Sequence, residues 1–139
     1  MAAAYQNQRR PIAVIAALAF VSFFIWIVVL ADKAYGTPWW SFIDQIPLGD
    51  KIGHLGLVST LSFLCNLAFT SWKSGRPSCR FTRTTWILLL ILTLEELSQA
   101  FIPHRHLDVF DWTADVAGLA IGQMTARFLS IRSPGTKAP

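Results

Sequence analysis

The stretch Glu95–Gly122, EELSQAFIPHRHLDVFDWTADVAGLAIG, decides the fold because it sets carboxylates inside two apolar segments. Its first carboxylates follow the apolar run Trp86–Thr93, and the chain then turns at Pro103. The second apolar segment carries three aspartates, Asp108, Asp111 and Asp115. Ionisable side chains are costly inside hydrocarbon, so a membrane segment that keeps them usually uses them. We therefore expect the functional site in this hairpin.

The composition favours a membrane protein. Apolar residues make up 53% of the 139 residues, and only 14% are charged. A soluble domain of this size needs a more polar surface. The length predicts one domain, residues 1–139. The net charge of +4 comes from basic residues that are spread between apolar runs. They form no dense patch, so we predict no nucleic-acid partner and attribute the basic residues to membrane topology.

Four segments are apolar and long enough to cross a bilayer as helices. They cover residues 11–31, 51–70, 84–102 and 109–129. The first follows a short polar leader and is longer than the hydrophobic core of a signal peptide, so we interpret it as an uncleaved anchor. The third is expected to end at Pro103, because proline breaks a helix. The sequence thus predicts an all-α integral membrane protein, an up-down four-helix bundle.

The distribution of charge predicts the orientation of this bundle. The leader, the loop 71–83 and the tail from Arg127 together hold nine Lys/Arg and no acidic residue. The remaining loops and span ends hold three basic residues and all eight carboxylates. Because cytoplasmic loops are enriched in Lys and Arg, both termini are predicted to be cytoplasmic. The acidic residues then face outward, in a multi-pass protein of the bacterial inner membrane.

The third span presents a polar face near its outer end. Glu95 and Gln99 are four residues apart, and Glu96 and Gln99 are three apart, so one face can pair the amide with either glutamate. These positions lie below the expected headgroup layer. A lone glutamate exposed to lipid there would cost several kcal/mol, so each is expected to face the bundle and to have a partner.

The fourth span carries its small and acidic residues on one narrow stripe, comprising Asp111, Asp115, Gly118 and Gly122. Asp108 is a natural N-cap for this helix. The GxxxG pair, Gly118 and Gly122, allows a neighbouring helix to approach closely. The glycines either serve packing only, or their close contact also brings Asp115 against the second or third span.

The second span begins with Asp50 and His54, which are one helical turn apart. A membrane histidine is often only hydrogen-bonded within the bundle. Alternatively, His54 meets Glu96 or Asp115 as a proton-transfer partner or a ligand. Further along, Ser59, Ser62 and Asn66 lie on a different face, and we interpret them as interhelical hydrogen-bonding residues.

The turn His104-Arg105-His106 offers imidazoles close to Asp108 and Asp111. Imidazole and carboxylate are suitable metal ligands. However, the sequence has no HExxH-like frame, and short HxH loops are common without metal, so we assign no metal site and predict no cofactor. Arg105 is interpreted as a clamp for a phosphate or carboxylate group, or as a surface ion-pair partner.

With these residues in view, the chain resembles the VanZ-like family of small bacterial membrane proteins, named for a teicoplanin-resistance protein. The matching elements, in chain order, are Asp50-Lys51-Ile-Gly-His54, Glu95-Glu96-Leu-Ser-Gln99, Pro103-His-Arg105, Asp108-Val-Phe-Asp111, Gly118 and Gly122. Asp115 stands where the family more often has asparagine, and His104 where a glycine is usual. The resemblance implies an inner-membrane protein with a link to the cell envelope or to glycopeptide susceptibility, and it supplies no reaction.

The leading hypothesis from the sequence is an outward-facing polar pocket that binds or processes the head group of an envelope lipid or cell-wall precursor. Its predicted residues are Asp50, His54, Glu95, Glu96, Gln99, Arg105, Asp108, Asp111 and Asp115. Glu96 and His54 would act as acid and base if chemistry occurs. The alternatives are a non-catalytic subunit or assembly factor of a membrane complex and, ranked last, proton or ion translocation. Membrane lipids and membrane proteins are the expected partners.

Overall fold

A computed structural model describes residues 2–33, 48–70, 80–102 and 107–132. These residues form four helices, and none of them lies in a strand. The helices are α1 (Ala2–Asp32), α3 (Gly49–Phe69), α4 (Arg83–Gln99) and α5 (Val109–Arg132). The all-α class and the four helices expected from the sequence are therefore confirmed.

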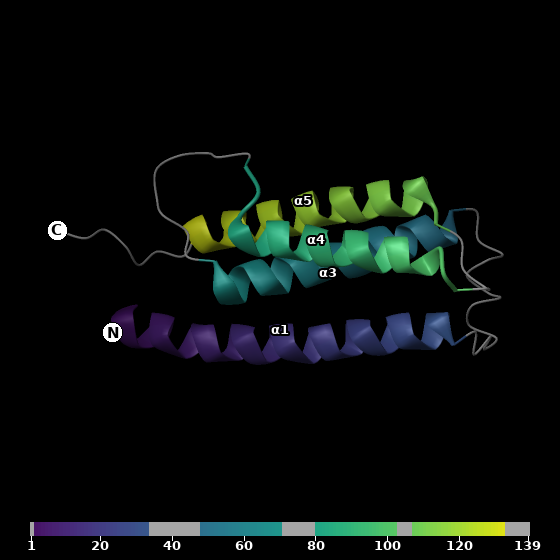
Figure 1. Cartoon of the computed structure of the whole chain (residues 1–139). Helices are drawn as coiled ribbons and strands as arrows, with labels where there is room; N and C mark the ends of the chain where they lie inside the picture. The colour runs from purple at the N-terminus through teal and green to yellow at the C-terminus, as the bar shows by residue number, and fades with distance from the viewer. Residues whose placement is uncertain (1, 34–47, 71–79, 103–106, 133–139) are drawn as a thin grey trace.

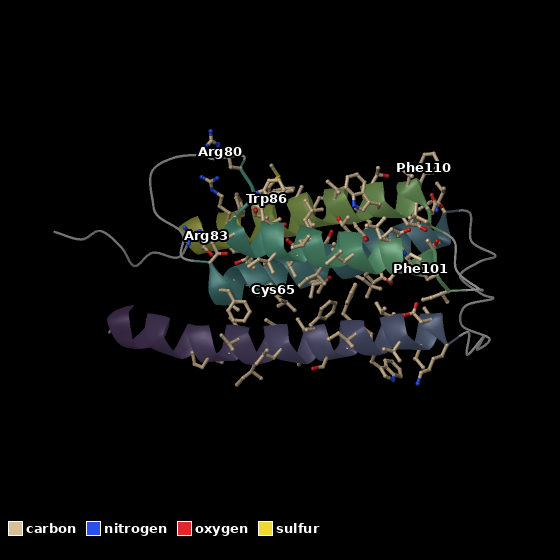
Figure 2. All side chains as sticks on the ribbon, viewed as in Figure 1. Cys65, Arg80, Arg83, Trp86, Phe101 and Phe110 are labelled. Carbon is tan, nitrogen blue, oxygen red and sulfur yellow. The ribbon has the colours of Figure 1, made fainter. Side chains whose placement is uncertain are left out.

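The four helices lie side by side and alternate in direction (Figure 1). α3 packs most extensively against α5, whereas α4 contacts both of them and α1 packs against α3. α1 begins and α5 ends at the same end of the bundle, where Arg80 and Arg83 also lie, and Phe101 and Phe110 mark the opposite end (Figure 2). We call the end with Phe101 and Phe110 the acidic end, because α3 begins there with Asp50.

Several helix boundaries differ from the sequence prediction, and the start of α1 and the end of α4 have an identifiable cause. α1 extends back through the expected leader to Ala2 and continues across Pro11, and the alanines and glutamines there are strong helix formers. α4 ends at Gln99 rather than at residue 102, and the chain continues in short turns, with Phe101 N donating to Ser98 O and Ile102 N to Gln99 O. A proline disfavours the α conformation of the residue before it, here Ile102, so the helix ends before that residue.

The contact between α3 and α5 depends on two glycines of α5. A Cβ at Gly122 would overlap the Ser59 carbonyl oxygen and would come within 2.7 Å of Phe63 N, both in the α3 backbone. A Cβ at Gly118 would lie 3.0 Å from the Leu55 carbonyl oxygen. The GxxxG pair therefore faces α3, and only glycine at residue 122 permits the observed separation of the two backbones.

The middle of the bundle is apolar. Val58 of α3, Leu92 of α4 and Leu119 of α5 are buried against one another and form one core cluster. Outside this core, α1 and α4 expose many large apolar side chains, including Trp26, Trp86 and Leu90. Two stretches of helix, Pro11–Asp32 and Gly49–Phe69, are long and apolar enough to cross a membrane.

Candidate functional site: a charged cluster at the acidic end

Side chains from α3, α4 and the start of α5 meet at the acidic end. We call this set the charged cluster, and its members are Asp50, Lys51, His54, Glu95, Glu96, Gln99, Asp108, Asp111 and Asp115. The exposed fraction of the side chain falls from 58% for Asp50 to 23% for His54 and 2% for Asp115. The charged cluster is therefore open to its surroundings at Asp50 and closed at Asp115.

Lys51 joins α3 to the start of α5. Its Nζ donates to Asp108 Oδ2 at 2.9 Å and to Asp111 Oδ1 at 2.7 Å, and it also lies 4.0 Å from Asp50 Oδ2. Charge-assisted hydrogen bonds of this kind are shorter and stronger than neutral ones. The bond from the Lys51 ammonium, helped by one from the Phe110 amide, lowers the pKa of Asp108 below its ordinary value of 3.8.

His54 lies between two carboxylates. Its Nδ1 is 3.0 Å from Oδ1 of the buried Asp115, and its Nε2 is 3.9 Å from Oδ1 of the exposed Asp50. A carboxylate on one ring nitrogen fixes the tautomer and the ring orientation, which leaves the other nitrogen available for a proton or a ligand. Of the two partners expected for His54, Asp115 is the one that forms the hydrogen bond.

Glu96 attaches the end of α4 to the start of α5. Its Oε1 accepts from the backbone amide of Asp108 at 2.8 Å, and its Oε2 accepts from Gln99 Nε2 at 3.1 Å. Gln99 Nε2 also lies 3.0 Å from Glu95 Oε1, so the amide is shared by both glutamates. Glu96 and Gln99 are buried. The buried glutamate thus faces the bundle and has partners, as the sequence predicts.

The first turn of α5 is arranged as its sequence predicts. Asp108 Oδ1 accepts from the Phe110 amide at 2.8 Å, which confirms the N-cap. Asp111 lies in the first turn, where the helix dipole favours negative charge. Asp111, Asp115, Gly118 and Gly122 are all buried, so the predicted stripe is the buried face of α5. Trp112 Nε1 donates to Thr93 Oγ1 at 3.0 Å and adds a link to α4.

Most of the predicted site residues come together in the charged cluster. The structure brings eight of them into it, Asp50, His54, Glu95, Glu96, Gln99, Asp108, Asp111 and Asp115. Arg105, His104 and His106 lie outside the described residues.

Lys51 is the member of the charged cluster that the sequence interpretation missed. From the sequence, Lys51 counts as part of the motif Asp50-Lys51-Ile-Gly-His54 and as one of the few basic residues on the acidic side of the chain, but it is not among the predicted pocket residues. That position was itself a signal, because a lysine there opposes the positive-inside distribution. Lys51 is also three residues before His54, so the two side chains share a face of α3.

Three residues of the charged cluster form a group suited to holding a metal ion. Asp50, His54 and Asp111 each offer one ligand atom, and these atoms all lie within 4.8 Å of one another. The cluster therefore offers a proton acceptor at His54, a cation at Lys51 and a set of converging carboxylates.

A second polar region lies at the other end of the bundle. We call it the threonine–amide network, and its members are Ser62, Asn66, Thr70, Thr82, Thr85 and Gln123. Asn66 Nδ2 donates to Thr85 Oγ1 at 3.0 Å, and Thr85 Oγ1 donates to Gln123 Oε1 at 2.7 Å. Ser62 Oγ donates to the Leu119 carbonyl at 2.8 Å. The interhelical hydrogen bonding expected of Ser62 and Asn66 is confirmed.

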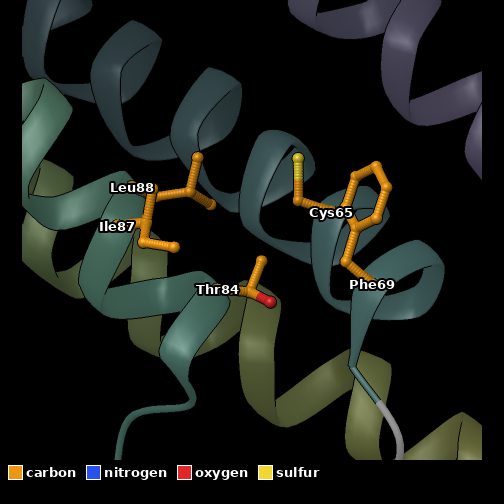
Figure 3. A pocket seen from close by; sticks show the side chains of 5 residues that line it. All are labelled: Cys65, Phe69, Thr84, Ile87 and Leu88. Carbon is orange, nitrogen blue, oxygen red and sulfur yellow. The ribbon is translucent and has the colours of Figure 1, made fainter.

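A small apolar pocket lies near the threonine–amide network, away from the charged cluster. Five residues of α3 and α4 line its volume of about 230 Å³: Cys65, Phe69, Thr84, Ile87 and Leu88 (Figure 3). Apart from the Thr84 hydroxyl and the Cys65 thiol, its side chains are hydrocarbon. The pocket therefore has no part in acid–base or ionic chemistry.

Comparison with known proteins finds no family model, no curated protein and no solved structure that matches the chain.

Proposed function

We propose that the chain is a multi-pass protein of the bacterial inner membrane and that all four helices span the bilayer. The apolar lengths of Pro11–Asp32 and Gly49–Phe69 support this, as do the large apolar side chains exposed along α1, α4 and α5. With Arg80 and Arg83 on the cytoplasmic side, both termini are cytoplasmic and the acidic end faces outward.

The charged cluster, in this proposal, binds or processes the polar head group of an envelope lipid or a lipid-linked cell-wall precursor. The observation that carries the proposal is the fall in exposure from Asp50 through His54 to the buried Asp115. An arrangement that opens at one end allows a ligand to reach His54.

The reactive centre of this site is His54, with Asp115 as its orienting carboxylate. The 3.0 Å contact at Nδ1 directs Nε2 toward the open side, where it can accept or donate a proton. Glu96 is the second group of the assigned acid–base pair. Its Oε1 and Oε2 are already held by the Asp108 amide and by Gln99, so its geometry is preorganised.

The proposal includes membership of the VanZ-like family. Of the motif residues that carry the resemblance, eight belong to the charged cluster, namely Asp50, Lys51, His54, Glu95, Glu96, Gln99, Asp108 and Asp111. Gly118 and Gly122 instead pack α5 against α3. This supports a shared site rather than a coincidence of short motifs. A link to the cell envelope and to teicoplanin susceptibility is part of the same proposal.

Native mass spectrometry of the gently extracted protein tests head-group binding. Wild type should carry a copurified lipid, and His54→Gln should lose at least about 10-fold in occupancy, since roughly 1.4 kcal/mol of lost binding is tenfold. Arg105→Ala should also lose it if Arg105 clamps an anionic group, as the sequence suggests. The matched control is Thr60→Ala, because the Thr60 hydroxyl is exposed and bonds only the Gly56 carbonyl of its own helix. Equal lipid occupancy in all four proteins would contradict the proposal.

The second candidate function is a non-catalytic subunit or assembly factor of a membrane complex. It is favoured by the bonds that Glu96 makes within the chain, which join α4 to α5 and so serve packing. This candidate predicts that Glu96→Gln weakens folding or complex formation without a separate loss of ligand. Loss of the lipid in a Glu96→Gln protein with unchanged melting temperature would exclude it.

Proton or ion translocation ranks below both. The charged cluster and the threonine–amide network are separated by the buried side chains of Val58, Leu92 and Leu119. This apolar layer offers no hydrogen-bonding side chain to carry a proton between the two polar regions. A proton flux in liposomes that disappears on Asp115→Ala would reverse the ranking.

A further inference from the structure

We propose that the charged cluster holds a divalent metal cation, bound by the Asp50 carboxylate, the Asp111 carboxylate and Nε2 of His54. This departs from the interpretation of the sequence, which assigned no metal site and considered the two histidines of the turn together with Asp108 and Asp111. It also deepens the proposed function, since it names the group that would meet an anionic head group.

The geometry of the three ligands fits one ion. Their donor atoms lie within 4.8 Å of one another, and ligands about 2.0–2.2 Å from a common metal lie about 3–4.4 Å apart. The separation of Asp50 Oδ1 from His54 Nε2, 3.9 Å, already lies within this range. Asp50 and His54 are one turn apart on α3, and Asp111 comes from α5, so the ion would join the two helices.

His54 is already oriented as a metal ligand. The bond between Nδ1 and Asp115 is the carboxylate–histidine pair that typically supports a metal-binding imidazole from behind. It places the proton on Nδ1 and leaves the lone pair of Nε2 on the side where Asp50 lies, 3.9 Å away. Asp115 is therefore a positioning residue for the site and not itself a ligand.

The balance of charge favours a further cation beside Lys51. The ligand atoms of Asp50 and Asp111 lie within 4.8 Å of each other, although one residue comes from α3 and the other from α5. Two carboxylates this close repel each other, and a cation bound by both relieves that repulsion. Lys51 bonds one oxygen of Asp111 and also serves Asp108, and a carboxylate retains a second oxygen for another partner.

The ligand types indicate which ion is bound. One imidazole and two carboxylates suit zinc or manganese better than calcium or magnesium, which prefer oxygen ligands alone. Three protein ligands leave at least one coordination position for water or another oxygen. If the proposed function holds, a phosphate oxygen of the head group takes that position, and this explains how an acidic site binds an anionic ligand.

Titration of the lipid-free, detergent-solubilised protein with Zn²⁺ or Mn²⁺, followed by calorimetry, tests the cation site. Wild type should bind one equivalent. Asp50→Asn and His54→Gln should each weaken binding at least about 10-fold, and Asp115→Asn should weaken it about 10-fold through the orientation of His54. Asp50 is exposed, so Asp50→Asn should fold. Asp32→Asn, which removes an equal charge from α1 outside the charged cluster, should bind as wild type does.

Three outcomes would overturn the cation site. They are no binding by wild type, unchanged binding by Asp50→Asn and His54→Gln, or binding that is lost in a His104→Ala/His106→Ala variant and so belongs to the turn. Native mass spectra of lipid before and after EDTA separate this inference from the proposed function. Lipid that stays bound after EDTA would support head-group binding and show that the cation is not needed for it. Cation binding by a protein that carries no copurified lipid would support the cation site and contradict head-group binding.

Discussion

The charged cluster and the threonine–amide network lie at opposite ends of the same three helices. They differ in charge and in how far their side chains are buried. The network is neutral, and hydrogen bonds between its own side chains join α3, the start of α4 and α5. Ser62, Asn66 and Thr85 in it are completely buried. The charged cluster instead combines a lysine, a histidine and several carboxylates, and its Asp50 side chain is 58% exposed.

This difference supports the proposal that the two regions have separate tasks. The threonine–amide network satisfies its donors and acceptors by hydrogen bonds within the protein, so it links α3, α4 and α5 to one another. The charged cluster combines charged side chains of both signs, and it is open to its surroundings at Asp50. We therefore attribute structure to the network and ligand binding to the charged cluster.

The largest expected effect comes from breaking the α3–α5 contact on which both regions depend. Gly122→Val places a side chain against the Ser59 carbonyl and Phe63 N of α3, and overpacking of this kind costs roughly 2–3 kcal/mol or more. The melting temperature should fall steeply, with loss of copurified lipid. Gly56→Ala is the matched control, because its Cβ would meet nothing within 4 Å, and it should leave stability equal or slightly higher. Equal stability of the two variants would show that α3 and α5 do not pack as described.

Thr85→Val sharpens the comparison by removing one hydroxyl from the threonine–amide network at nearly constant volume. The buried hydroxyl bonds Asn66 and Gln123, so its loss should cost about 1–2 kcal/mol of unfolding free energy. Ligand binding at the charged cluster should not change. Thr60→Val, which alters an exposed hydroxyl, should be nearly neutral. Equal unfolding free energies for the two variants would show that the network contributes nothing to stability.

Asp115→Asn changes the charged cluster, and we expect it to weaken binding while it leaves stability nearly unchanged. The amide has the size of the carboxylate and can still accept from His54 Nδ1, so the unfolding free energy should change by less than about 1 kcal/mol. The charge that supports the imidazole is lost, and the affinity of the charged cluster for Zn²⁺ or Mn²⁺ should fall about 10-fold. Titration and thermal unfolding of the same preparation measure both. A large loss of stability without loss of affinity would assign Asp115 to packing.

The smallest expected effect is the dependence of stability on acid pH. The pKa of Asp108 is lower in the folded protein than in the unfolded chain, because Lys51 and the Phe110 amide stabilise the carboxylate. Its contribution to stability is therefore fully present above about pH 4 and is lost as the pH falls below that value. Thermal unfolding from pH 6 to pH 3 should show this loss, and Asp108→Asn should reduce it. An identical pH profile in Asp108→Asn would contradict the pairing with Lys51.

The sequence was sufficient for features that repeat along one helix. The spacing of Asp111, Asp115, Gly118 and Gly122 predicted the buried face of α5, and the spacing of the glutamates with Gln99 predicted their shared amide. The N-cap at Asp108 was predictable in the same way. Each of these depends only on the 3.6-residue period and on the local chemistry of a helix end.

Contacts between helices were not predictable to the same degree. The choice of Asp115 over Glu96 as the partner of His54, and the bonds from Lys51 to Asp108 and Asp111, depend on the axial register of α3 against α5. That register is set by the close contact at Gly122, and a period within one helix does not contain it. The early end of α4 at Gln99 was missed because proline acts on the residues before it as well as on its own position.

The most direct test of the division between the two regions compares Asp50→Asn with Thr85→Val, measuring melting temperature and ligand occupancy on the same purified samples. We predict that Asp50→Asn has the melting temperature of the wild type and loses the copurified lipid. Thr85→Val should melt at a lower temperature and retain the lipid. If occupancy instead follows stability in both variants, or if neither variant loses ligand, the charged cluster is not a binding site distinct from the packing of the bundle.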